Sequence, residues 1–182
     1  MNFKIIPYSE DLDLTEFYQT AKSKGYENNS SKKILIDSIS KERDWQVWFL
    51  TYNDKIVGST GAHTFDEMGE NSYRILCRTC VFTDAVPIPH MRTKVGIMEH
   101  KNITAQHFIP KCIEWAGENN NLYITSNDSE GGSQKAVHKV YMPLLAKLKQ
   151  VEKIKDLPYR GHTQTVWKLN VKNFKRSFKK WI

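Results

Sequence analysis

Three cysteines and several histidines are the side chains of this chain that could do redox or metal chemistry. Cys77 and Cys80 have the CxxC spacing of redox motifs and zinc sites. They lie, however, in a run of β-branched and aromatic residues that predicts a strand, where the two side chains would point to opposite faces. His90, His100 and His107 lack zinc-site spacing and a carboxylate partner. We therefore expect reduced, structural cysteines and no bound metal.

Acid–base chemistry points to the segment that begins at Gln134. Its spacing is Gln134-x-x-Val137-x-x-x-Tyr141. A phenol has a pKa of about 10 and can donate or accept a hydrogen bond, so Tyr141 is a candidate for a general acid. The alternative is an ordinary tyrosine on a helix face that packs against a sheet, and the sequence leaves both interpretations open. Four residues dispersed along the chain are candidates for a general base: His63, Glu67, Glu70 and Asp84. A relay through water is a further option.

Hydrophobic periodicity predicts the elements that must position these residues. Seven segments have the pattern of strands: Phe3–Tyr8, Gln46–Tyr52, Ile56–Phe65, Tyr73–Phe82, Leu122–Ser126, Val151–Leu157 and His162–Asn170. Four have the pattern of helices: Leu12–Gly25, Ser31–Arg43, Ile103–Glu118 and Ser133–Leu148. The order β-α-α-β-β-β-α-β-α-β-β predicts an α/β (α+β) fold, with a central mixed sheet of about seven strands flanked by about four helices.

Length and composition limit the remaining possibilities. The 182 residues suit one domain, which we place at residues 1–171, followed by a basic, aromatic tail at 172–182 that we expect to be solvated. The net charge of +7 favours polyanionic partners such as nucleic acid or a phosphorylated cofactor. No apolar run approaches the ~20 residues that span a bilayer. The N-terminal segment has no signal-peptide core, so we expect a cytoplasmic protein.

The order of these elements, together with the spacing that ends at Tyr141, resembles the GCN5-related N-acetyltransferase (GNAT) family over roughly residues 2–171. The resemblance implies a sheet that splays open after its fourth strand and admits the pantetheine of acetyl-CoA or another acyl-CoA. It places the pantetheine along the backbone of Cys80, Val81 and Phe82. It also implies that Tyr141 protonates the departing thiolate.

The same resemblance assigns the phosphate contacts. The family binds the pyrophosphate with Gln/Arg-x-x-Gly-x-Gly/Ala before its third helix, and His100-Lys-Asn-Ile-Thr-Ala105 occupies that place here. His100 stands for the Gln/Arg and Ile103 for the first glycine. The implied ligands of the cofactor are completed by Lys101, Asn102, Thr104 and Ala105, with Asn127 at the end of the fifth strand.

Two features leave alternatives around this segment. The loop 83–102 is about twice as long as a strand–helix link requires, which is consistent with either a substrate lid or a surface flap. Pro110 lies inside the predicted helix. Because an interior proline costs ~3 kcal/mol or more, the helix alternatively begins near Ile109, with the phosphate loop at Thr104–Phe108.

Three functions are compatible with the predicted fold and composition. The first is an acyl-CoA-dependent N-acyltransferase, with acetyl as the expected acyl group, that acts on a small-molecule or peptide amine. The second is a binding or assembly module that has the same fold and has lost acyl-CoA. The third is a nucleic-acid modifier on this scaffold, which is suggested by the basic charge and a Lys- and Asn-rich, phage-like composition.

Overall fold

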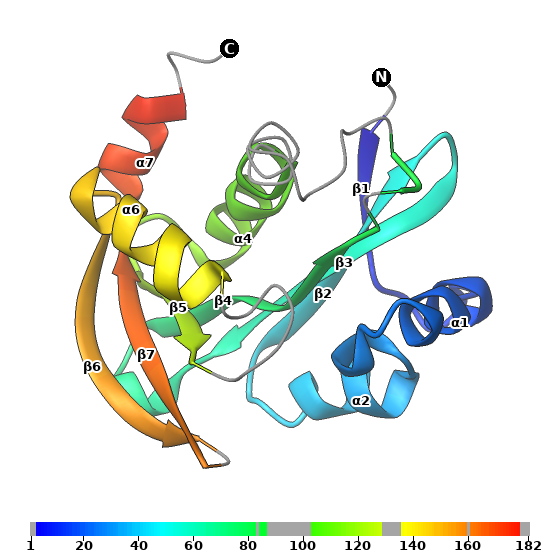
Figure 1. The fold of residues 1–182 in the computed structure, drawn as a ribbon, viewed down its shortest axis with the longest axis horizontal. Helices are drawn as coiled ribbons and strands as arrows, with labels where there is room; N and C mark the ends of the chain where they lie inside the picture. The colour runs from blue at the N-terminus through cyan, green and yellow to red at the C-terminus, as the bar shows by residue number, and fades with distance from the viewer. Residues whose placement is uncertain (1–2, 83, 87–102, 129–135, 160, 179–182) are drawn as a thin grey trace. The chain divides into compact units, whose positions relative to one another are not determined.

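The computed structural model describes residues 3–82, 84–86, 103–128, 136–159 and 161–178 of the chain. The strands form one seven-stranded mixed sheet in the order β1-β2-β3-β4-β5-β7-β6 (Figure 1). The predicted order of elements and the predicted fold class are confirmed. The chain divides into two compact units: the first comprises Met1–Thr64 and Leu76–Trp115, and the second Phe65–Ile75 and Ala116–Ile182.

The first unit contains β1 (Phe3–Pro7), β2 (Trp45–Tyr52), β3 (Lys55–Thr64) and most of β4 (Ser72–Val81). β1 pairs with β2, and β2 pairs with β3, in antiparallel orientation. Asn53 and Asp54 connect β2 and β3 with φ angles of 49° and 63°. Two successive positive φ angles are typical of the type I′ turn, whose twist matches that of the flanking strands.

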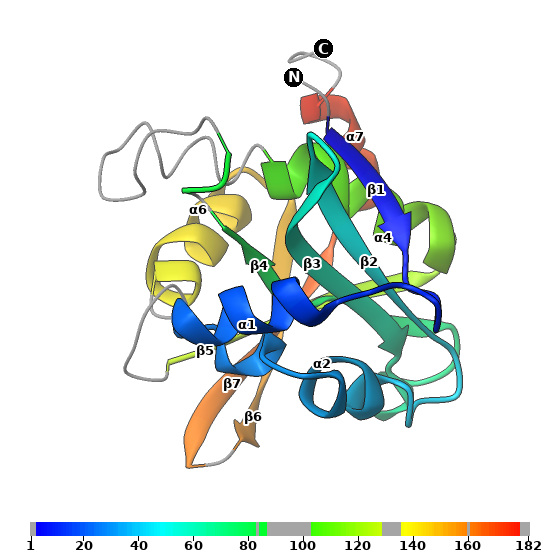
Figure 2. The same ribbon diagram turned by 90° about the vertical axis from the view of Figure 1, so that its right-hand side faces the viewer.

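One face of these strands is covered by α1 (Thr15–Ser23), η1 (Glu27–Asn29) and α2 (Lys32–Ile39), which lie next to one another in Figure 2. Ser31 caps α2, since its hydroxyl accepts a hydrogen bond from the Ile34 N–H at 3.3 Å. The apolar residues of both helices share a buried cluster with β2 and β4: Leu14, Phe17, Ala21, Leu35, Ile36, Ile39, Val47, Phe49, Cys77, Cys80 and Phe82.

The opposite face carries η3 (Thr104–Phe108) and α4 (Ile109–Ala116). Ile103 and Phe108 are buried with Leu50, Val57 and Val81. η3 is a π turn in which the Ile109 N–H bonds to the Thr104 carbonyl, five residues back. Pro110 follows directly and has no N–H to donate to the carbonyl four residues back. The wider π turn accommodates the loss of this hydrogen bond. The helix therefore includes residues before Ile109, and the alternative in which Thr104–Phe108 form a loop is wrong.

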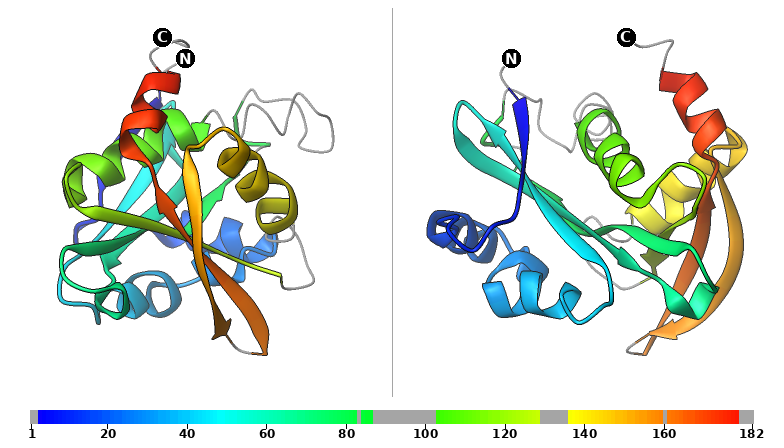
Figure 3. Two further views of the ribbon diagram at one scale, coloured as in Figure 1. Left: turned by 90° about the vertical axis from the view of Figure 1, so that its left-hand side faces the viewer. Right: turned by 180° about the vertical axis from the view of Figure 1, so that it is seen from behind.

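In the second unit, β5 (Asn121–Asn127) and β6 (Val151–Tyr159) flank β7 (His162–Leu169), both antiparallel to it. The first residues of β4, Ser72–Arg74, pair in parallel with Asn121–Tyr123 of β5, which confirms the predicted parallel neighbours. The helical segments are η2 (Asp66–Met68), η4 (Val137–Tyr141), α6 (Met142–Lys147) and α7 (Val171–Phe178). Figure 3 shows α7 continuing directly from the end of β7.

Three local predictions are wrong. Cys77 and Cys80 do not point to opposite faces, because both lie in the cluster beneath α1 and α2. Arg78 between them has a φ of 49°, and this left-handed residue interrupts the two-residue alternation of the strand. Pro158 and Tyr159, which lie beyond the predicted strand Val151–Leu157, belong to β6.

The third concerns the C-terminal tail. The first residues of the 172–182 tail, expected to be a solvated end, belong to α7 (Val171–Phe178), where Phe174 is only 4% exposed. The side chain of Asn170 caps this helix by accepting a hydrogen bond from the Asn173 N–H at 3.0 Å.

Candidate functional site

Tyr141 is the last residue of the π turn η4, and α6 begins immediately after it. The Met142 N–H bonds to the Val137 carbonyl, and Pro143 comes next. A π turn inserts one residue into a helix, so Tyr141 is rotated by about 100° relative to α6 compared with a regular helix. Such turns often occur at functional sites. Burial raises the pKa of Tyr141, so its phenol holds its proton at neutral pH and is able to donate it.

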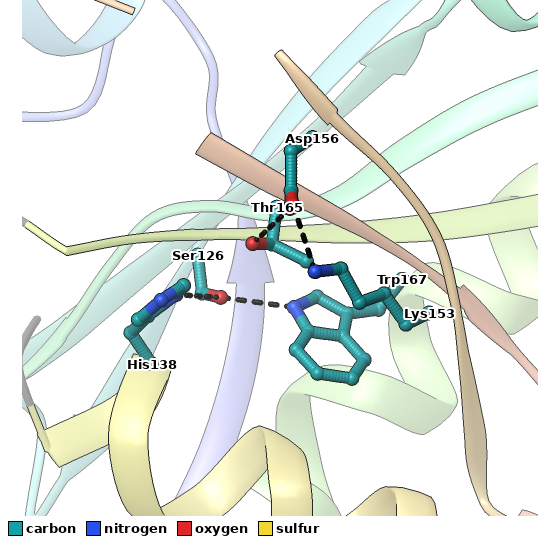
Figure 4. Close-up of polar contacts among 6 residues, drawn as sticks. All are labelled: Ser126, His138, Lys153, Asp156, Thr165 and Trp167. Atoms are coloured by element: carbon teal, nitrogen blue, oxygen red, sulfur yellow. Dashed lines mark hydrogen bonds and ion pairs between the residues drawn. The ribbon is translucent and has the colours of Figure 1, made fainter. Parts of the chain in front are cut away.

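A buried polar contact lies on the same turn. The Trp167 indole N–H donates a hydrogen bond to the hydroxyl oxygen of Ser126 at 2.9 Å, and Ser126 Oγ lies 3.0 Å from His138 Nδ1 (Figure 4). The register of β5 and β7 explains this geometry. Ser126 pairs with Thr165, and Trp167 is two residues further along β7, so both side chains are on the face that η4 covers.

The hydrogen-bonding capacity of Ser126 connects His138 to Trp167. The indole nitrogen only donates, so Ser126 Oγ accepts from Trp167. Toward His138 Nδ1 the same hydroxyl either donates its hydrogen or accepts with its second lone pair, depending on the form of the imidazole. Tyr141 and His138 thus bring two polar side chains to one turn of helix.

A second group of polar side chains lies on β6 and β7, next to the contact of Ser126, His138 and Trp167. Asp156 faces Thr165 in the register of β6 and β7, and the Thr165 hydroxyl donates to Asp156 Oδ1 at 2.7 Å. Lys153 donates to Asp156 Oδ2 at 2.8 Å (Figure 4). The pKa of Asp156 is lowered, chiefly by its hydrogen bond from Lys153 and then by that from Thr165, with a smaller electrostatic contribution from His138. Asp156 is therefore an ionised carboxylate at neutral pH.

The predicted pantetheine segment is in the first unit. Cys80, Val81 and Phe82 are each at most 2% exposed, so a cofactor could contact only their backbone. Part of that backbone is engaged: the Phe82 N–H bonds to the Val57 carbonyl at 2.7 Å, and the Tyr26 hydroxyl donates to the Val81 carbonyl at 3.3 Å. Burial raises the pKa of the Cys80 thiol to about 11, so this thiol is not a nucleophile at neutral pH.

The other predicted cofactor ligands are in different places. Thr104 and Ala105 belong to η3 in the first unit, whereas Asn127 ends β5 in the second unit, where it pairs with Gln164. His100, Lys101 and Asn102 lie outside the described residues, as do 87–99 of the long loop. Ile103, which stands where the family has glycine, is 7% exposed and packs in the hydrophobic cluster with Phe108.

None of the candidate general bases has the environment of one. His63 is 9% exposed, and its Nδ1 contacts the Thr64 carbonyl at 2.5 Å. Asp84 forms an ion pair with Lys24, which lowers the pKa of Asp84. Glu67 and Glu70 are exposed around η2. The sequence interpretation missed His138 and Trp167. The usable signal was the position of His138, three residues before Tyr141.

Within the described part of the chain, no group of three or more His, Cys, Asp or Glu side chains is arranged to hold a metal ion. All three cysteines are buried, and none forms a disulfide. Among the helices of these same residues, none is long and apolar enough to cross a membrane.

Comparison with solved structures identifies the fold. An acetyltransferase-like protein from Desulfovibrio desulfuricans, assigned to the GNAT family, matches with a TM-score of 0.58 and 12% identity, over 93% of this chain and 99% of its own. FeeM, an N-acyl amino acid synthase from uncultured soil microbes, matches with a TM-score of 0.57 and 9% identity, over 96% and 94% of the two chains. An acyl-CoA N-acyltransferase from Pseudomonas aeruginosa matches with a TM-score of 0.51 and 10% identity, over 92% of this chain and 98% of its own.

The sequence itself matches no protein-family model and no curated protein. At identities this low, the similarity defines the architecture alone. The chain has the GNAT fold, in a divergent sequence, and this confirms the fold implied by the resemblance.

Proposed function

We propose that this protein is an N-acyltransferase that moves an acyl group, such as acetyl, from coenzyme A to an amine. The observation that carries the proposal is a GNAT fold over more than nine tenths of the chain, with a tyrosine on the helix that follows β5. Among the similar structures, one is named an acyl-CoA N-acyltransferase and another an N-acyl amino acid synthase. Three buried cysteines that form no disulfide are consistent with a reducing, cytoplasmic location.

Acyl-CoA would supply an activated thioester. In the proposed binding mode, the backbone of Cys80, Val81 and Phe82 holds the pantetheine, and the pyrophosphate lies at His100–Ala105, with Lys101 as the positive charge. Asn127 contributes a polar contact from the end of β5. The burial of the three β4 side chains supports a contact made by the backbone alone. The Val81 carbonyl accepts one hydrogen bond from the Tyr26 hydroxyl and has a second lone pair for the pantetheine.

Two side chains of η4 have roles in the proposal. The Tyr141 hydroxyl holds the proton that the departing sulfur requires, since a phenol is protonated at neutral pH and burial raises the pKa of Tyr141 further. His138 is held by the contact of its Nδ1 with Ser126, and we assign its ring as a hydrogen-bond donor to an oxygen that gains negative charge. Because none of the four candidate bases, His63, Glu67, Glu70 and Asp84, has the environment of a base, we propose that the amine loses its proton to water.

The test uses acetyl-CoA in two measurements. Thermal-shift titration measures binding, because a ligand at 100 times its Kd stabilises the folded state by about 2.7 kcal/mol. Thiol release over a panel of amines, polyamines, peptides and nucleic acids measures turnover. Tyr141→Phe should lower turnover roughly 10²–10⁴-fold, the usual contribution of a positioned acid, with binding near wild type. Tyr52→Phe in β2 is the matched control and should retain wild-type turnover.

The outcomes separate the candidate functions. Absence of both acetyl-CoA binding and thiol release from the wild type would reject the transferase and favour a binding module on the GNAT fold. If the wild type is active and Tyr141→Phe equals it, the transferase stands and Tyr141 is an ordinary packed tyrosine.

A further inference from the structure

A groove in the second unit has no role in the proposed acyl transfer. It has a volume of about 690 Å³ and lies where the end of α6, β6, β7 and the start of α7 meet. Four lysines line it, Lys149, Lys153, Lys168 and Lys172, with two acidic residues, Glu118 and Glu152. We call it the basic groove. A smaller hollow of about 520 Å³ shares Glu118 and Lys172 with it and adds Lys175 and Arg176.

The walls of the basic groove are held by backbone hydrogen bonds. Lys149 follows α6 with a φ of 55°, and the Gln150 N–H bonds back to the Leu145 carbonyl at 2.9 Å. The Asn170 N–H bonds to the Gln150 carbonyl at 2.8 Å. The Asn173 side chain donates to the Lys149 carbonyl at 2.9 Å. The turn after α6 and the start of α7 are thereby joined, so the groove is formed before any ligand binds.

The charge of the basic groove is only partly compensated. Lys153 is paired with Asp156, and Lys175 at the adjoining hollow is paired with Glu118. Within the described part of the chain, the ammonium groups of Lys149, Lys168 and Lys172 have no ion-pair partner. Lys168 faces Glu152 in the register of β6 and β7, so Lys149 and Lys172, at the end of α6 and in α7, are the groove lysines without a carboxylate paired opposite them.

This arrangement fits a ligand with several separate negative charges. A lysine is a compact point charge, which suits phosphate oxygens, whereas planar carboxylates are better matched by the fork of arginine. No aromatic side chain lines the groove. Single-stranded nucleic acids are usually held by stacking of bases on aromatic rings, and a duplex offers only its backbone to such a surface. We propose that the basic groove binds the phosphodiester backbone of double-stranded nucleic acid without reading its sequence.

The experiment measures binding of the full chain to a fluorescently labelled DNA duplex by anisotropy at several salt concentrations. At physiological salt we expect a Kd of roughly 10⁻⁴–10⁻⁶ M, with log K falling linearly as log salt rises. The double variant Lys149→Gln/Lys172→Gln should weaken binding at low salt by about tenfold or more and make the slope less steep by about 1.8, since each phosphate contact contributes about 0.9.

The matched control is Lys22→Gln/Lys41→Gln, which has the same net charge and changes two exposed lysines of the first unit. It should bind as the wild type does. Equal binding by the two double variants would overturn the proposal, because net charge alone would then account for affinity. Failure of the wild type to bind the duplex at low salt would overturn it as well.

Two competitors define the ligand class. Duplex RNA should compete as duplex DNA does, because both present the same phosphodiester charge. Polyglutamate should compete much more weakly, and equal competition would assign the basic groove to an acidic protein. The acetyl-CoA thermal shift of the double variant should equal that of the wild type, so this result is independent of the acyl-transfer proposal.

Discussion

Single residues differ in whether their buried polar atoms have partners. Asn29 is 3% exposed, and its side-chain nitrogen donates to Ser59 Oγ at 2.9 Å and to the Arg78 carbonyl at 2.6 Å. Both hydrogens are used, and the second fixes the carbonyl of the left-handed residue in β4. Tyr18 in α1 is the opposite case, since its buried hydroxyl has no hydrogen-bond partner among the described residues.

The Tyr18 hydroxyl should therefore cost stability. A buried polar group without a partner costs about 1–3 kcal/mol. Tyr18→Phe removes the hydroxyl and keeps the ring, so we expect the free energy of unfolding at pH 7 to rise by roughly 1 kcal/mol, measured by urea denaturation. Tyr52→Phe is the control, because its hydroxyl is not among these atoms.

The pH dependence of the same variant supplies a second readout. Burial raises the pKa of Tyr18 to about 12, from an ordinary value of 10.0. Between these values the folded protein keeps a proton that the unfolded chain loses, so stability is present below pH 10 and is lost as the pH rises toward 12. The stability of Tyr18→Phe should fall less steeply over this window than that of the wild type. Parallel curves would show that the hydroxyl has a partner or is solvated.

At the scale of elements, the two helices that follow β4 and β5 share one irregularity. In each, a five-residue π turn ends two residues before a proline, Pro110 after η3 and Pro143 after η4. The proline cannot donate to the carbonyl four residues back, and the π turn moves the hydrogen-bond register by one residue. In the second helix, this shift sets the direction of Tyr141.

Pro143→Ala tests that relation. Alanine restores an N–H and favours a regular helix, so thermal stability should rise, with up to about 3 kcal/mol regained. Tyr141 would then rotate relative to α6, and thiol release should fall at least about tenfold, since small misplacements of catalytic groups are costly. Lys147→Ala, at the exposed end of α6, is the control. Unchanged turnover in a stabilised Pro143→Ala variant would show that the π turn does not position the tyrosine.

At the scale of the whole molecule, the boundary between the two units falls inside regular elements. One crossing lies between Ile75 and Leu76, within β4, and another between Trp115 and Ala116, at the end of α4. Because β4 has residues in both units, one unit cannot unfold alone without breaking backbone hydrogen bonds of this strand. This continuity supports the proposal that residues 1–171 are one domain.

We therefore predict a single cooperative unfolding transition. Calorimetric and van't Hoff enthalpies should agree at about 130 kcal/mol, from about 0.7 kcal/mol per residue at 60 °C for the 182-residue chain. Native-state hydrogen exchange should give the same highest protection free energy for β2 in the first unit and β7 in the second. Two calorimetric peaks, or a β7 that opens well before β2, would divide the domain.

The sequence by itself determined the succession of elements and their type. Long, periodic apolar patterns such as those of Gln46–Tyr52 and Ser31–Arg43 depend on local burial, and the N-cap at Ser31 and the turn at Asn53–Asp54 depend on local backbone preferences. The spacing that ends at Tyr141 also selected a candidate that the structure places half-buried on a helix after β5.

Only the tertiary structure decided the features that depend on contacts between distant residues. The left-handed Arg78 is held by Asn29, 49 positions away, and it brings Cys77 and Cys80 to one face. His138 acquires its partners from β5 and β7, and the basic groove forms where the two ends of separate helices meet. These contacts depend on the register of the strands and on packing between distant segments. Neither can be read from the residues that are neighbours in the sequence.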